Sequence, residues 1–116
     1  RELWRRIVFS VAISNTDDHL RNHGFLLDKS GWRLSPAYDI NPTPRGTGLS
    51  LNISEEDNNL DFDLCLEVID FFRWKAAEAT KFIEQTKQIT SQWKERARRL
   101  NISHEEQSSM ENAFVK

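Results

Sequence analysis

Asn15-Thr16-Asp17-Asp18-His19-Leu20-Arg21-Asn22 is a run with seven polar side chains in eight residues, between two apolar stretches of this 116-residue chain. Asp39 follows later, in the triplet Tyr38-Asp39-Ile40. Short polar side chains bond to nearby backbone and favour turns, so the run predicts a loop at the end of a helix. One interpretation is that this run is only a turn that ends the helix. The relative positions of Asp17, Asn22 and Asp39 favour another, in which the loop carries chemistry.

The spacing of these three residues matches what phosphoryl transfer requires. In protein kinases, a catalytic-loop Asp meets the substrate hydroxyl, an Asn about five residues later binds magnesium, and a second Asp beyond it binds the metal again. Asp17 and Asn22 have that interval, and Asp39 follows a candidate hairpin. We therefore expect Asp17 to orient or deprotonate a hydroxyl. Asn22 and Asp39 would hold Mg²⁺ together with the phosphates of ATP.

The segments on either side of the loop predict how it is held. Apolar residues at helical spacing predict a helix over residues 2–14 with a buried face. Residues 24–27 and 32–34 predict two short strands joined by a turn. Such a hairpin would return Asp39 to the side of Asn22, as a shared metal site requires.

Residues 15–25 and 32–40 together resemble the C-terminal region of the HipA-like serine/threonine kinases, the toxin components of bacterial toxin-antitoxin pairs. The pattern N-x-D-x-H-x-x-N and the later Tyr38-Asp39 pair carry the resemblance. It implies a mainly α-helical fold, a bundle-like C-terminal kinase lobe with one short β-hairpin next to the catalytic loop. It also implies that His19 is a structural member of the loop, bonding backbone or carboxylate to hold Asp17 in place.

The resemblance further implies the partners. These are ATP, a protein substrate such as a translation component (an aminoacyl-tRNA synthetase, for example), and a helix-turn-helix antitoxin repressor. DNA would be reached only indirectly, through the antitoxin. Two features of the loop stay open at this point. By the resemblance, Asp18 occupies a variable position of the pattern, and it is interpreted as a turn residue or a modest contributor to local negative potential. His19 and His23 raise the alternative of zinc, which would need further nitrogen or sulfur ligands.

The remainder of the chain predicts helices. Residues 49–53 alternate like a short extended segment, and Asp61 or Asp63 can cap a helix that follows. A longer helix is expected to run to about Leu100, with one apolar face. Ser103-His104-Glu105-Glu106 is a capping box for a last helix that reaches Phe114. The apolar face of the long helix is formed by Ala79, Phe82, Ile83, Thr86, Ile89, Trp93, Ala97 and Leu100.

The composition limits the classes of protein to which the chain can belong. Hydrophobic residues make up 38% of the chain, charged residues 29%, and the net charge is −2, which indicates a globular domain without a general nucleic-acid-binding surface. No apolar run is long enough for a membrane helix, and we expect a cytoplasmic protein without a membrane partner. Cys65, the single cysteine, falls in a helical apolar pattern and is interpreted as a core side chain.

We expect residues 1–116 to form one domain, the lobe of a HipA-like kinase that carries the catalytic loop and metal ligands. A kinase also needs a cover over the phosphates and a Lys paired with a Glu, all preceding the catalytic loop. No such motif is present, so we expect the nucleotide-covering lobe to be absent and the isolated chain to be inactive. The alternative is a non-catalytic module that binds the antitoxin repressor through the acidic segment 55–70 or the basic cluster 94–99.

Overall fold

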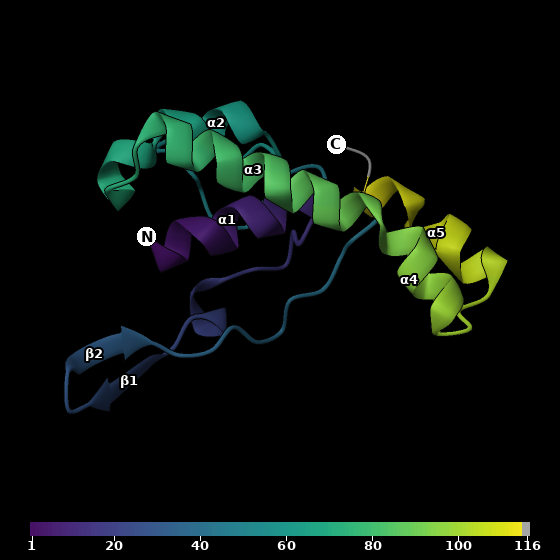
Figure 1. Ribbon diagram of the computed structural model, residues 1–116, viewed down its shortest axis with the longest axis horizontal. Helices are drawn as coiled ribbons and strands as arrows, with labels where there is room; N and C mark the ends of the chain where they lie inside the picture. Colours follow the sequence, from purple (N-terminus) through teal and green to yellow (C-terminus); the bar gives the residue numbers. More distant parts are fainter. Residues whose placement is uncertain (115–116) are drawn as a thin grey trace.

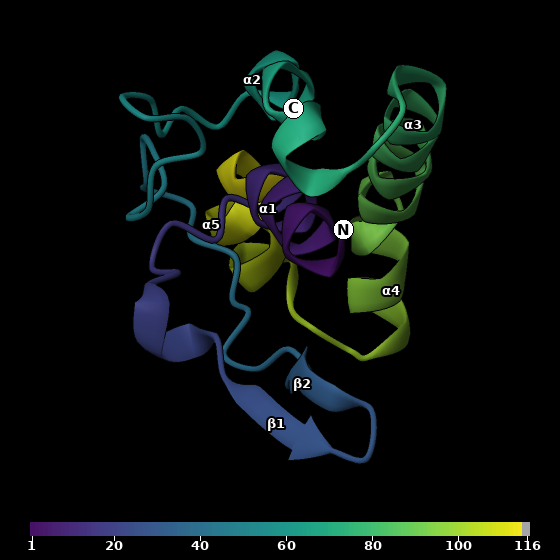
Figure 2. The same cartoon turned by 90° about the vertical axis from the view of Figure 1, so that its left-hand side faces the viewer.

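A single buried helix, α1 (Glu2–Ala12), organises the fold. The computed structural model of the protein describes residues 1–114. Trp4, Val8 and Val11 fall on one face of α1 and are completely buried. They pack against α2 (Phe62–Glu67) and α3 (Ala76–Ser91), which flank α1 in Figures 1 and 2. The amphipathic pattern over residues 2–14 therefore predicted this helix, although α1 ends at Ala12.

Aromatic rings fill the centre of this helical body. The ring centroids of Trp4 and Trp74 are 4.9 Å apart, and that of Phe82 lies 5.8 Å from Trp4. The Trp4 indole N–H donates to the carbonyl of Cys65 at 2.8 Å, so the buried polar atom of the ring is satisfied. Trp4 and Phe82, which lie on predicted apolar helix faces, thus contribute to the core together with Trp74.

The loop after α1 leads through η1 (Leu20–Asn22), one 3₁₀ turn, into a two-stranded antiparallel sheet. Its strands are β1 (Phe25–Asp28) and β2 (Gly31–Leu34), with Phe25 opposite Leu34. Gly31 has a φ of 107°, a left-handed conformation that suits glycine at this tight turn. The predicted hairpin is confirmed. Figure 1 shows it extending away from the helices.

The other elements are η2 (Ile69–Phe72), α4 (Trp93–Arg99) and α5 (His104–Phe114). Asp61 caps α2 by accepting from the backbone N–H of Asp63 at 2.8 Å. Ser103 and Glu106 form the predicted capping box, in which Ser103 Oγ accepts from the Glu106 N–H and Glu106 Oε2 accepts from the Ser103 N–H. Both predicted helix starts are confirmed. So is the mainly helical fold with one small hairpin.

Two predicted elements are wrong. The long helix does not continue to Leu100, because it breaks at Gln92 into α3 and α4. The hydroxyls of Thr90 and Ser91 donate to carbonyls of the preceding turn, which weakens the helix there. Ile89 and Leu100, expected on its buried face, are exposed.

Residues 49–53 do not form the expected extended element. An isolated bridge joins the adjacent Gly48 to Asn59, and the Asn58 side chain donates to the Leu49 carbonyl at 2.6 Å. A side-chain amide thus takes the place of a neighbouring strand. Within residues 1–114, no helix combines the length and the apolar composition needed to cross a bilayer.

Candidate functional site

A sharp change of direction places the polar loop at the end of α1. Ser14 has a φ of 52°, in the left-handed region, and the Asn15 N–H donates to the Ser10 carbonyl at 2.8 Å. The Ser14 hydroxyl donates to the carbonyl of Ala113 in α5 at 2.9 Å. The start of the loop is therefore held by the buried helix on one side and by the last helix on the other.

The loop and the segment after the hairpin meet at Asn22 and Asp39. The Asn22 side-chain NH₂ donates to Asp39 Oδ2 at 2.9 Å, and the Asn22 amide oxygen accepts from the His19 N–H at 3.0 Å. The Tyr38 hydroxyl donates to the Arg21 carbonyl at 2.6 Å. The hairpin thus returns Asp39 to Asn22, as the sequence predicted.

Asp39 and Asn22 differ in whether their side-chain oxygens are available to bind a cation. Asp39 is exposed, and each of its oxygens accepts one hydrogen bond, from Asn22 or from Asn41. Lone pairs remain on both oxygens, so this carboxylate fits a hard cation such as Mg²⁺. Asn22 is buried and directs its NH₂ group, not its oxygen, toward Asp39. The amide would have to turn, losing its bond to His19, before both residues could bind one ion.

Asp17 and His19 are placed differently from each other. Asp17 is exposed, and its carboxylate makes no hydrogen bond or ion pair with any residue from 1 to 114. His19 contributes its backbone N–H to Asn22, whereas its Nδ1 atom is buried without a hydrogen-bond partner in the described chain. His19 therefore braces Asn22 through its backbone.

Asp18 and His23 form a pair that the sequence interpretation missed. His23 Nε2 lies 2.9 Å from Asp18 Oδ2, and both side chains are largely buried. The interpretation of Asp18 as a turn residue or a contributor to local negative potential did not include this pairing. Because η1 lies between them, residues five positions apart face each other across one turn. That spacing around a short turn was the available signal.

Arg6 is a second residue that sequence reasoning missed. It is 8% exposed, which is rare for arginine, and its guanidinium donates through Nη2 to the Ser35 carbonyl. Arg6 Nε also lies 3.5 Å from Glu2 Oε1. The Ser35 bond ties α1 to the segment that leads into Asp39. Arg6 lies between Glu2 and Ser10 on the polar side of α1, so the sequence carried no signal for this contact.

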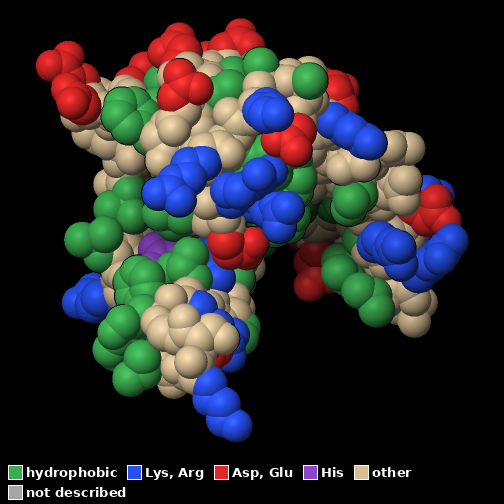
Figure 3. Space-filling view, turned by 60° about the vertical axis from the view of Figure 1, so that its left-hand side comes forward, with side chains coloured by type: hydrophobic (Ala, Val, Ile, Leu, Met, Phe, Trp, Pro, Cys, Tyr) green, Lys and Arg blue, Asp and Glu red, His purple; other side chains and the backbone are tan. Residues whose placement is uncertain are grey.

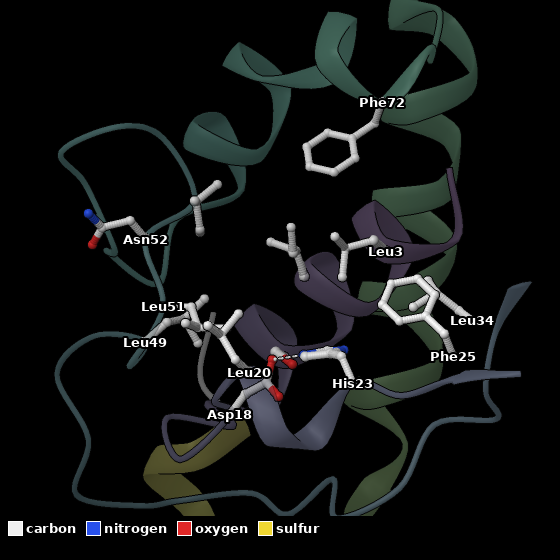
Figure 4. Close-up of a pocket in the computed structure, with 13 residues that line it drawn as sticks. Leu3, Asp18, Leu20, His23, Phe25, Leu34, Leu49, Leu51, Asn52 and Phe72 are labelled. Carbon is white, nitrogen blue, oxygen red and sulfur yellow. Dashed lines mark hydrogen bonds and ion pairs between the residues drawn. The ribbon is translucent and has the colours of Figure 1, made fainter. Parts of the chain in front are cut away.

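An apolar pocket of about 380 Å³ opens beside the polar loop. Its walls come from α1, the hairpin, η2 and the segment 49–53, and the Asp18–His23 pair contributes to the lining (Figure 4). A separate polar cavity of only about 10 Å³ lies among Arg6, Asn22, His23 and neighbouring residues. The Asp18–His23 pair lines both spaces.

The segment after Asp39 packs closely on the polar loop. The Ser50 hydroxyl donates to the Thr16 carbonyl at 2.6 Å, and the Thr43 N–H donates to the Ser14 carbonyl at 3.0 Å. A Cβ atom at Gly46 would lie 2.2 Å from the Thr16 side chain, closer than atoms can approach. Any residue with a Cβ atom at position 46 would overlap the Thr16 side chain, so glycine is required there.

Titratable groups outside the loop have structural roles. Burial raises the pKa of the Cys65 thiol to about 12, and the nearby charge of Asp61 acts in the same direction. Cys65 is a free, fully buried side chain, which confirms its interpretation as part of the core. Within residues 1–114, no three His, Cys, Asp or Glu side chains gather as a metal cluster. A cation at Asp39 would thus rely on non-protein ligands for most of its coordination.

Fold and loop together define a helical domain in which a hairpin brings a carboxylate beside a loop amide. A family model described as "HipA-like C-terminal domain" matches residues 1–100, and the chain belongs to that family. The chain is also 40% identical over 48 residues to a protein of Haemophilus influenzae named "Putative kinase". That match covers 38% of this chain and 14% of the relative. No solved structure matches.

Proposed function

We propose that this chain is the C-terminal, metal-binding portion of a protein serine/threonine kinase that transfers the γ-phosphoryl group of ATP to a protein hydroxyl. The observation that carries the proposal is the contact between Asn22 and Asp39 across the hairpin, with Asp17, which has no partner among residues 1–114, at the other end of the same loop. Family membership and the kinase name of the relative add support.

Each residue has a role suited to its surroundings. Asp17 is exposed and free of partners among residues 1–114, so it can accept a proton from, or orient, an incoming hydroxyl, an effect worth about 10² to 10⁴ in rate. Asp39 and Asn22 would hold Mg²⁺. When bound, Mg²⁺ neutralises charge on the phosphates of ATP.

The orientation of the Asn22 side-chain amide leads to a specific prediction about magnesium binding. In the structure its NH₂ group donates to Asp39 Oδ2 at 2.9 Å. Binding of Mg²⁺ would then break this contact and turn the amide. The prediction is that the Asn22 side-chain amide signal in an NMR spectrum moves on addition of Mg²⁺.

The 116 residues contain no glycine-rich phosphate motif of the forms G-x-G-x-x-G or G-x-x-x-x-G-K-[ST]. The first helix before the loop is committed to the core through Trp4, Val8 and Val11. We therefore expect catalysis only when another polypeptide segment covers the phosphates, and no turnover by this chain alone.

The test is a titration of the chain with Mg²⁺, with and without ATP, followed by calorimetry and by the Asn22 amide signal. Asp39→Ala should abolish magnesium binding because it removes the one carboxylate ligand. Asp70→Ala is the matched control, because Asp70 is an exposed aspartate on η2, remote in sequence from the loop. Equal binding by Asp39→Ala and the wild-type protein would contradict the proposal.

A second candidate function is binding to an antitoxin repressor without catalysis. In α4, Lys94 and Arg99 are paired with Glu111 and Glu95, whereas Arg96 and Arg98 have no ion-pair partner among the described residues. These two arginines could contact an acidic partner. A pull-down with a helix-turn-helix repressor that is lost on reversing both charges would favour this function.

A further inference from the structure

We propose that the apolar pocket beside the polar loop recognises a bulky aliphatic or aromatic side chain of the protein substrate, next to the hydroxyl that is phosphorylated, in a segment with basic flanking residues. The inference rests on the proposed function, since it names the substrate class of the same site. It is carried by the position, lining and charge of the pocket.

The pocket begins one residue from the proposed base. Asp17 is followed directly by Asp18, whose side chain lines the pocket, and Leu20 of η1 lines it as well. A peptide that brings a hydroxyl to Asp17 therefore has its neighbouring side chains within reach of the pocket mouth. Figure 4 shows Leu20 and the Asp18–His23 pair on the same side of this space.

The lining suits an apolar side chain. Most of its residues are aliphatic or aromatic, and they come from five separate parts of the fold. A volume of about 380 Å³ falls within the range of ligand pockets. Leu20 and Phe25 line the pocket while remaining 76% and 63% exposed, so they form its mouth. Covering them with an apolar side chain would remove hydrophobic surface from water.

The polar groups of the pocket argue against a nucleobase. Asp18 and His23 bond to each other, which leaves little of the donor and acceptor pattern that a base edge requires. Asn22, the proposed partner of the phosphate-bound metal, lines the small polar cavity and not the apolar pocket. The Asp18–His23 pair lines both spaces, so it separates the small cavity beside Asn22 from the apolar pocket.

Charge around the pocket favours basic residues in the peptide. No Lys or Arg is among the lining residues, whereas Asp18 is. Beyond the wall residue Ile53, a tight turn closed by the Ile53 N–H and the Asp57 carbonyl at 2.7 Å presents Glu55 and Glu56 to solvent. Neither glutamate has an ion-pair partner within residues 1–114. In Figure 3, acidic side chains gather at the top of the view, hydrophobic ones lie at the lower left, and Lys and Arg side chains lie between the two groups.

The test uses the whole chain and synthetic heptapeptides, without Mg²⁺ or ATP. Each peptide has one serine, a neighbouring leucine on one side or the other, and two flanking arginines. Binding is measured by calorimetry and by NMR shifts of the leucine methyl groups and the His23 ring. Replacing the peptide leucine with alanine should weaken binding by about tenfold or more, because the buried side chain is lost. Replacing the arginines with glutamates should weaken it further.

Two variants of β1 provide a matched comparison. Phe25 and Leu27 lie on the same strand and are 63% and 64% exposed, but only Phe25 lines the pocket. Phe25→Ala should reduce the preference for the leucine peptide over the alanine peptide, and Leu27→Ala should leave it unchanged. Unchanged circular dichroism of both variants shows that each remains folded.

Equal binding of the leucine and alanine peptides, or equal effects of the two variants, would overturn the proposal. So would shifts of the pocket residues caused by adenosine and not by any peptide, since the pocket would then be a nucleoside subsite. These outcomes are independent of the metal titration. Loss of the peptide preference with intact Asp39-dependent magnesium binding would reject the pocket assignment alone.

Discussion

The helical body and the layer formed by the polar loop and hairpin are held together in different ways. In the body, Trp4, Val8 and Cys65 are completely buried and the aromatic rings pack on one another. In the other layer all four residues of β1 are exposed, and single hydrogen bonds from Tyr38, Asn22 and Ser50 join the segments. The candidate site is therefore held by a small number of hydrogen bonds, whereas the helical body beneath it is held by buried, closely packed side chains.

The largest effect is expected for Trp4→Ala. Removing a fully buried tryptophan and its bond to the Cys65 carbonyl should lower the free energy of unfolding by about 3–5 kcal/mol. Trp32→Ala in the hairpin, where the side chain is exposed, should change it by less than about 0.5 kcal/mol. Denaturant titration of both variants measures the contrast. Similar losses would mean that the hairpin is part of the body.

A pH-dependent effect should also be confined to the body. The Cys65 pKa is about 12 in the folded protein, against a usual value of 9.0. The unfolded chain therefore loses this proton first, and stability falls as pH rises above the usual value. Between pH 9.0 and about 12, the free energy of unfolding of the wild-type protein should fall by about 1.4 kcal/mol per pH unit relative to that of Cys65→Ala. A constant difference between the two proteins would contradict burial of the thiol.

Arg6 connects the two regions, and its removal should affect both. Arg6→Ala leaves the Ser35 carbonyl without its charged donor, which should cost about 1–3 kcal/mol and shift the Asn22 amide signal. Arg5→Ala is the control, because Arg5 is on the same helix and also contacts Glu2, but it is exposed and does not contact Ser35. It should cost less than about 1 kcal/mol and leave the signal in place.

The smallest effect is expected for Tyr38→Phe, which removes one hydrogen bond between the polar loop and the segment after the hairpin. The hydroxyl bond to the Arg21 carbonyl should contribute about 1 kcal/mol. Because only the position of Asp39 depends on it, magnesium affinity should fall while the unfolding midpoint changes little. A large drop in that midpoint with unchanged affinity would place Tyr38 in the body instead.

Local patterns predicted the parts of the fold that local physics decides. The helical periodicity of residues 2–14, the hairpin turn and the Ser103–Glu106 capping box each depend on neighbours in sequence, and each is present. The contact between Asn22 and Asp39 was also predictable, because a hairpin returns the chain to its start.

Three other features were not predictable in this way. The break at Gln92 coincides with hydroxyl bonds from Thr90 and Ser91 to the preceding turn, although the apolar face continued across it in the sequence. The Arg6 bond to Ser35 joins segments far apart in the chain. The Asp18–His23 pair was missed because η1 had no periodic signal of its own.

The contact of Gly46 with Thr16 has a consequence for the genetics of this protein. Every missense codon at this position adds a Cβ atom, and there is no space for one beside the Thr16 side chain. Gly31 differs, because nothing lies within 4 Å of its missing Cβ and only its φ of 107° opposes a side chain. Selection of a saturation library for folded protein should therefore remove every substitution at codon 46, whereas substitutions at codon 31 meet backbone strain without a steric clash.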